Sequence, residues 1–308
     1  MSPHAPDDEA LLETARTAPE NVDLDAVVAL FDAERGHVRN VALRCALFVA
    51  VDDPDRVAAI SERVIERLED EFPVARSTAA AVLATIANEH PEAVRPGLPA
   101  LVDTLDQHPP RTGYRAARAL GPVLEAEPAG FVPEADALLD VLADPPTVWA
   151  PGPSELAEFP AGKRDSVADC LESRRDEIET DRARARGIRE FTAHALVEVT
   201  ARAPEAVADR LEEFVPALSN EPPLARAATI DAIANVARAD PAAAEPTIDA
   251  VIDRLEDEAE YVRAHAVRAL GFAEATDAVE PLRTVAEEAD GEVGELAADT
   301  AEWLVDAD

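Results

Sequence analysis

The feature that most limits how this chain can fold is a repeat of 37 residues. The repeat is marked by an arginine, which is replaced once by glycine. The marker positions are Arg39, Arg76, Gly113, Arg189, Arg226 and Arg263. Neighbouring markers are 37 residues apart, except that Gly113 and Arg189 are separated by 76 residues, which correspond to two periods. Proline follows five of them by 15 residues, at Pro54, Pro91, Pro128, Pro204 and Pro241. An aliphatic residue follows five of them by seven, at Leu83, Leu120, Leu196, Ile233 and Leu270. A period of this length indicates one structural unit that is repeated and stacked.

Each period has the pattern of two helices. Apolar Val64, Ile65 and Leu68 have helical spacing, an acidic turn follows, and an alanine-rich helix is expected from about Val74 until Pro91 ends it. A single helical hairpin cannot bury its own apolar face, whereas stacked hairpins can. The sequence therefore predicts an all-α fold, an α-solenoid of stacked antiparallel helix pairs.

The details of the repeat resemble a known family. The segment from Val262 to Ala266 (Val-Arg-Ala-His-Ala) opens a second helix, and Asp70 and Asp257 precede the next marker arginine by six residues. Together with the period and the hairpin, these features resemble HEAT repeats, in particular the short repeats of archaeal and bacterial HEAT proteins. The resemblance covers nearly the whole chain. It implies one solenoid over residues 1–308, about eight repeats long counting degenerate ones, with a Pro/Gly-rich insertion at about 144–181.

The resemblance also implies a polar ladder between adjacent repeats, formed by the turn aspartate and the marker arginine. The expected carboxylate or amide positions are Asp70, Asn220 and Asp257, which would pair with Arg76, Arg226 and Arg263 or their neighbours. The third repeat carries Gln107 and Gly113 at these positions, so the ladder is expected to break there.

The segment from about residue 144 to 181 interrupts the repeat pattern. Its dense proline and glycine predict a loop. Trp149 and Phe159 lie in it, in a chain with only 4% aromatic residues. Exposed insertions of repeat proteins often lie at binding faces, which makes both aromatics candidate partner-binding residues. The alternative is that Trp149 folds back and fills the core of the irregular repeat.

The charge balance is strongly acidic. There are 64 acidic and 28 basic residues, a net charge of -36, and Lys163 is the only lysine. This pattern is typical of proteins from halophiles, because at about 1 M salt the screening length is roughly 3 Å and a dense carboxylate surface stays soluble. The alternative is an ordinary acidic protein. In either case the acidity is spread over the chain and does not identify a basic partner.

Nothing in the sequence indicates a membrane or secreted protein. The longest apolar run, residues 41–51, is interrupted by Arg44 and is too short to span a bilayer. The N-terminal residues lack the pattern of a signal peptide. Cys45 and Cys170 stand far apart and suggest no disulfide framework. We therefore expect a cytoplasmic protein.

No catalytic, metal-binding or cofactor-binding pattern emerges. The six histidines show no helical metal spacing. Glu89-His90 has the wrong order for the iron-binding pair of some HEAT hydroxylases, and Gly162-Lys163-Arg164 lacks the remainder of a phosphate loop. We expect no enzyme activity and no cofactor.

One row of positions on the second helices suggests binding. Five residues after the markers lie Arg44, Arg118, His194 and Arg268, with Ala81 and Asp231 between them. They would lie on one stripe of the concave face. Three interpretations stay open: the side chains pair with nearby carboxylates, they meet an acidic protein partner, or they contact nucleic acid.

The leading hypothesis is a non-catalytic scaffold or adaptor that presents a curved helical surface to a protein partner. The first alternative is an accessory or lyase-like factor that grips a substrate protein. The second is a nucleic-acid-binding repeat protein, which we do not expect because no basic stripe dominates.

Overall fold

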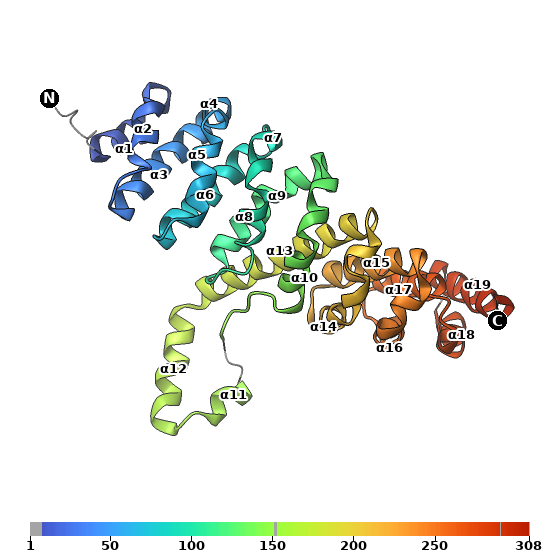
Figure 1. Ribbon diagram of the computed structural model, residues 1–308. Coiled ribbons are helices and arrows are strands. Elements are labelled where there is room, and N and C mark those ends of the chain that lie inside the picture. Colours follow the sequence, from blue (N-terminus) through green and yellow to red (C-terminus); the bar gives the residue numbers. More distant parts are fainter. Residues whose placement is uncertain (1–7, 151–152, 290, 308) are drawn as a thin grey trace. The chain divides into compact units, whose positions relative to one another are not determined.

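The computed structural model describes residues 8–150, 153–289 and 291–307, and within these ranges it contains helices and turns but no β-strand (Figure 1). The predicted all-α class, an α-solenoid of stacked helix pairs, is confirmed. The chain forms two compact units. The first contains the residues up to 126 together with 146–188, and the second contains 127–145 together with the residues from 189 onwards. The prediction of a single solenoid over residues 1–308 stays a prediction.

In the first unit, three long helices pack in chain order, namely α3 (Gly36–Asp52), α6 (Pro73–Ile86) and α9 (Arg111–Ala126) (Figure 1). Each is the second helix of a repeat and contains a marker position. α1 (Asp8–Thr17) packs against α3. The first helices of the repeats are short segments, in order η1 (Pro19–Asn21), α2 (Leu24–Leu30), α4 (Pro54–Ala58), α5 (Ser61–Ile65), η2 (Glu66–Glu69), α7 (Pro91–Val94), η3 (Arg95–Gly97) and α8 (Leu98–Val102).

Proline decides where these short segments begin and break. Pro54 and Pro91 occupy the first position of α4 and α7, where the missing amide costs nothing because the first turn has no intrahelical partner for it. The Asp53 side chain caps α4 by accepting from the Arg56 amide. Further along, Pro96 interrupts the first helix of its repeat. The expected continuous first helix is therefore divided into short α and 3-10 segments.

The core of each unit consists mostly of aliphatic side chains. The five positions seven residues after the markers are at most 1% exposed, namely Leu83, Leu120, Leu196, Ile233 and Leu270. Full burial of a leucine or isoleucine side chain contributes about 1.5–3 kcal/mol, so this row holds neighbouring repeats together. Alanines such as Ala79 and Ala80 are also fully buried, which lets the helices approach closely.

The second unit repeats this arrangement. α15 (Pro223–Ala239), α17 (Glu260–Phe272) and α19 (Glu292–Ala307) pack in chain order (Figure 1). Residues 189–200, the end of α13 (Arg175–Thr200), precede them, and Asn235 Nδ2 donates to the Val197 carbonyl oxygen between α15 and this end of α13. The remaining segments are η4 (Pro128–Glu134), α10 (Ala135–Ala143), η5 (Pro204–Ala206), η6 (Ala208–Phe214), α14 (Val215–Asn220), η7 (Pro241–Thr247), α16 (Ile248–Ile252), η8 (Asp253–Glu256), η9 (Thr276–Ala278) and α18 (Val279–Glu288).

The insertion differs from the expected loop. It contains α11 (Pro153–Glu158), α12 (Ala161–Ser173) and the first part of α13 (Figure 1). The reason is the placement of its prolines: Pro153 begins α11, Pro160 precedes α12, and no proline follows until residue 204. Proline at a helix start is compatible with helix, so the residues after Pro160 are free to form one.

Candidate interaction site

The turns of the first unit are joined by a ladder of arginines. Arg39 Nε and Nη2 donate to the two carboxylate oxygens of Asp70, each at 2.6 Å. Burial disfavours the ionised form of Asp70, but hydrogen bonds from Arg39 and from the Phe72 amide outweigh it and lower the pKa of the Asp70 carboxyl. Arg76 contacts Asp70 only through the backbone carbonyl oxygen, at 2.9 Å. The carboxylate of Asp70 therefore pairs with the arginine of the preceding repeat.

The second unit contains an equivalent arginine–aspartate pair. We call each such contact between adjacent repeats a rung of the ladder. Arg226 Nε and Nη2 donate to the Asp257 carboxylate at 2.8 and 2.7 Å, and the Ala259 amide donates to it at 3.0 Å. Arg263 Nη1 donates to the Asp257 carbonyl oxygen at 2.8 Å. Burial again opposes ionisation, and the hydrogen bonds from Arg226 and Ala259 outweigh it and lower the pKa of Asp257.

A further rung joins Arg189 to Glu221. Burial raises the pKa of the Glu221 carboxyl, against the attraction of Arg189. The side chain of Asn220, the neighbouring residue for which a ladder role was predicted, lies outside the described residues.

The ladder changes character at the third repeat. Arg76 Nε donates to Gln107 Oε1 at 3.3 Å, so this rung has a neutral amide where other rungs have a carboxylate. At Gly113 a Cβ atom would lie 2.2 Å from the Leu105 carbonyl oxygen. The backbone approaches too closely for any larger residue, arginine included.

The four residues of the predicted row lie exposed on second helices. Arg44 on α3 and Arg118 on α9 belong to the first unit, and among the described residues neither forms a hydrogen bond or an ion pair. His194 and Arg268 belong to the second unit. His194 Nδ1 lies 2.7 Å from the Glu190 carbonyl oxygen, while Arg268 contacts no carboxylate in the part of the chain that is described. Their role in binding stays a prediction.

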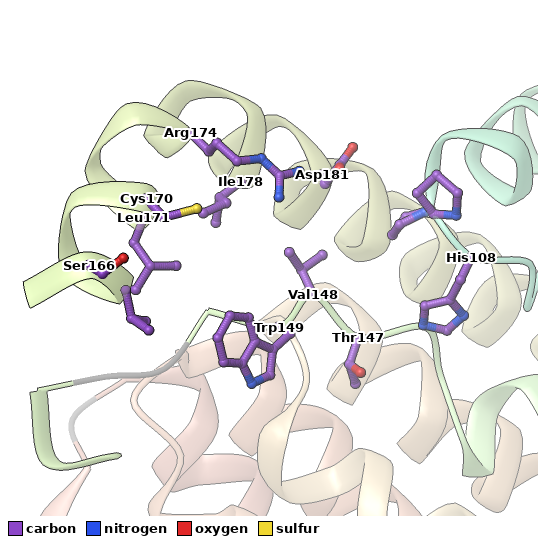
Figure 2. A pocket seen from close by; sticks show the side chains of 13 residues that line it. His108, Thr147, Val148, Trp149, Ser166, Cys170, Leu171, Arg174, Ile178 and Asp181 are labelled. Atoms are coloured by element: carbon purple, nitrogen blue, oxygen red, sulfur yellow. The ribbon is translucent and has the colours of Figure 1, made fainter. Parts of the chain in front are cut away.

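Trp149 borders a hollow of the first unit, which we call the Trp149 cleft. Its volume is about 700 Å³, and it is lined by His108, Pro109, Pro110, Thr147, Val148, Trp149, Ser166, Val167, Cys170, Leu171, Arg174, Ile178 and Asp181. Figure 2 shows Val148 and Trp149 on one side and Arg174, Ile178 and Asp181 on the other, with His108 at one end. The Trp149 side chain is 67% exposed, so it does not fill the core. Phe159 is half-buried and lies outside the cleft lining.

One wall of the cleft is the apolar face of α12. Val167, Cys170 and Leu171 have the i, i+3, i+4 spacing of one helical face, and Ile178 on α13 continues the apolar surface. No residue of α12 whose side chain is described is buried within the unit. The sequence carried this signal, but the nearby prolines and glycines predicted a loop and obscured it.

The polar groups of the cleft have separate partners. Arg174 Nε binds Glu177 at 2.9 Å, Asp181 binds Arg184 at 2.6 Å, and His108 Nδ1 lies 3.2 Å from the Asp106 carbonyl oxygen. Cys170 is a free, exposed thiol. Among the described residues, no group of three His, Cys, Asp or Glu side chains is placed to hold a metal ion. The cleft therefore combines an apolar wall with charged side chains that pair with other residues of the first unit.

The comparisons with known proteins agree on the class of fold. The family model for HEAT repeats matches residues 211–302. The crystal structure of an archaeal HEAT-like repeat protein from Thermococcus onnurineus NA1 matches with a TM-score of 0.51 at 14% identity, over 93% of this chain and 98% of that one. Two engineered proteins match with TM-scores of 0.52 and 0.50 at 18% and 20% identity, each over 82% of this chain and over 97% and 98% of their own. No curated protein matches.

These matches define an α-solenoid of the HEAT type. Residues 211–302 are HEAT repeats by sequence, and the structural likeness extends the same fold over most of the remaining chain. The HEAT family is therefore assigned for residues 211–302, and the remaining chain shares the fold. Among the described residues, no helix has both the length and the apolar composition needed to cross a bilayer.

Proposed function

We propose that this protein is a non-catalytic scaffold or adaptor that binds a protein partner at the Trp149 cleft. The observation that carries the proposal is an apolar cleft of about 700 Å³ with a 67% exposed tryptophan at its edge. Large exposed apolar side chains beside a concave surface are typical of interaction sites, and tryptophan is enriched among the residues that dominate binding energy.

The fold supports this role. Stacked helices hold side chains in a fixed array, so the repeat protein loses little conformational freedom when a partner binds. The partner itself is not identified. We propose that this protein and its partner are cytoplasmic and that they bind each other in a salt-rich cytoplasm. The net charge of -36 of this chain is suited to such a medium.

The test compares the two tryptophans of the chain. Trp149→Ala removes the exposed side chain at the cleft, and Trp303→Ala is the matched control, because Trp303 is 48% exposed on α19 of the second unit. The purified variants are used to capture partners from a native extract in high salt, followed by mass spectrometry. We expect capture of a protein that Trp149→Ala abolishes and Trp303→Ala preserves.

Two results contradict the proposal. Equal capture by both variants removes the cleft as the binding site. Recovery of nucleic acid alone, lost on nuclease treatment, replaces the scaffold function with nucleic-acid binding.

A further inference from the structure

A second groove of the first unit carries a charge opposite to that of the whole protein. Its volume is about 530 Å³, and it lies between α3, α6 and α9. Among the described residues, four arginines line it, Arg44, Arg76, Arg111 and Arg115, and no aspartate or glutamate does. We call it the arginine groove. It shares His108 and Pro109 with the Trp149 cleft, so the two sites adjoin.

The concentration of positive charge is unusual in this chain. Acidic residues outnumber basic residues by 64 to 28 overall. Two other grooves of the protein are lined by more acidic than basic residues, in line with this overall excess. One, at the Arg39 rung, is lined by Asp32, Glu66, Glu69, Asp70 and Glu71 against two arginines. The other is lined by Asp253, Glu256, Asp257, Glu280 and Glu288 against one arginine.

In the described part of the chain, none of the four arginines has a carboxylate partner. Within residues 8–150, 153–289 and 291–307, the structure contains no ion pair to any of them, although arginines elsewhere in both units bind aspartate or glutamate. Arg44 and Arg111 are exposed. The guanidinium groups of this groove are therefore available to an anion from outside.

The break in the ladder accounts for the contribution of Arg76 to this charge. At the rungs of Arg39 and Arg226 the arginine is neutralised by a buried aspartate. At Arg76 the corresponding partner is Gln107, whose amide accepts a hydrogen bond but carries no charge. The repeat that departs from the ladder pattern is thus the one that leaves its arginine unneutralised at the groove.

Arg115 adds an incompletely compensated charge. Its Nη1 donates to the carbonyl oxygen and the hydroxyl of Ser77, both at 2.8 Å. Burial, together with the positive charges of Arg111 and Arg184, lowers the pKa of Arg115 to about 10. A cation in such surroundings gains from an anionic partner more than an exposed arginine does, because its desolvation is not offset by a carboxylate of the protein.

We propose that the arginine groove binds an acidic segment of the protein partner, through carboxylates that pair with Arg44, Arg76, Arg111 and Arg115. The proposal rests on the proposed function and names the chemistry of the partner. Guanidinium groups bind carboxylates through two parallel hydrogen bonds, which lysine cannot do. One partner segment that carries an apolar anchor and several carboxylates would occupy the cleft and the groove together.

The size of the groove favours a peptide over nucleic acid. A nucleic acid needs an extended basic surface to neutralise successive phosphates. Here four arginines are confined to one groove, in a protein with a net charge of -36. A short acidic segment matches this local charge without extending over the acidic surroundings.

The direct test uses the full chain and a fluorescein-labelled octaglutamate peptide, with a serine-glutamine peptide of equal length as the neutral probe. Binding is followed by fluorescence anisotropy in about 0.3 M KCl, where the screening length is short enough to suppress repulsion from distant carboxylates. The double variant Arg44→Gln/Arg111→Gln removes two exposed side chains that have no partner among the described residues. The matched control is Arg35→Gln, which removes an exposed arginine at the start of α3 outside the groove.

We expect the octaglutamate peptide to bind and the neutral peptide not to bind. The double variant should weaken binding about tenfold, the combined effect of two charge-assisted contacts, while Arg35→Gln stays within about twofold. Absence of octaglutamate binding, or an equal loss in Arg35→Gln, overturns the proposal. So does tighter binding of inorganic phosphate or of an oligothymidylate of equal length through the same arginines.

The partner-capture assay separates this proposal from the proposed function. If capture depends on Trp149 but is unchanged in Arg44→Gln/Arg111→Gln, the acidic-segment proposal fails and the scaffold function stands. If octaglutamate binds through the groove and no partner depends on Trp149, the scaffold function at the cleft fails. A concentration-dependent dimer of the wild-type chain that the double variant abolishes would identify a second copy as the acidic ligand and overturn the assignment to a different protein.

Discussion

Replacement of Asp257 by alanine should destabilise the second unit more than any exposed charge change. The Asp257 and Arg226 side chains are 2% and 9% exposed, and two hydrogen bonds of 2.8 and 2.7 Å join them. Removing one partner of a buried pair costs about 3–5 kcal/mol, because the remaining charge stays buried without compensation. Arg226 keeps a hydrogen bond to the Glu221 carbonyl oxygen, so we expect the lower end of that range.

The isosteric variant tests the origin of this cost. Asp257→Asn keeps an oxygen that can accept from Arg226, as Gln107 accepts from Arg76, but it removes the charge. We expect it to cost about 1–2 kcal/mol, less than the alanine variant, since the hydrogen bond survives without its charge assistance. Glu280→Ala provides the control, because Glu280 is 80% exposed in its pair with Arg283 and such a pair contributes less than about 1 kcal/mol.

The measurement is urea denaturation at constant KCl, followed by far-UV circular dichroism, because urea leaves the ionic screening unchanged. A loss of about 3 kcal/mol corresponds to a decrease of roughly 6–12 °C in the melting temperature of a unit of this size. An alanine variant within about 1 kcal/mol of wild type, or an asparagine variant as unstable as the alanine variant, would refute the view that the rung is a buried, charge-compensated contact.

Three further predictions follow from the ladder. Gly113→Ala should destabilise the first unit by about 2 kcal/mol or more in the same urea assay, because its Cβ would lie 2.2 Å from the Leu105 carbonyl oxygen; a neutral effect would contradict the close approach. Gln107→Asp should give Arg76 a carboxylate partner, which stabilises the first unit and weakens octaglutamate binding. If the variant is more stable but binds the peptide with unchanged affinity, the charge of the Arg76 rung does not contribute to binding in the groove. The lowered pKa of Asp70 and of its counterpart in the second unit means that both contribute stability above pH 3.8 and lose it as the pH falls through their folded-state pKa values; a pH titration of stability that stays flat below pH 3.8 would exclude this contribution.

Much of the fold could be predicted because the repeat is a local pattern. For five of the six markers, the sequence itself shows a proline 15 positions later and, for five, a leucine or isoleucine seven positions later, and both depend on helix geometry over a few turns. The rung partners depended on more than spacing. Asp70 lies close to Arg76 in sequence, yet its carboxylate binds Arg39 of the preceding repeat. Which of two neighbouring arginines reaches the carboxylate is decided by how the repeats stack.

The sequence by itself determined the helical class, the repeat and the core positions, because helix formation and amphipathic burial act over short distances along the chain. Only the tertiary structure decided the sites. Trp149 was visible as an aromatic residue in an irregular segment, but the apolar face of α12 opposite it appeared only once that segment folded into helices. The arginine groove joins residues from three repeats, and Arg111 and Arg115 have no feature in the sequence that sets them apart. Their shared positive charge follows from the packing of α3, α6 and α9, which brings the four guanidinium groups together with no described carboxylate among them.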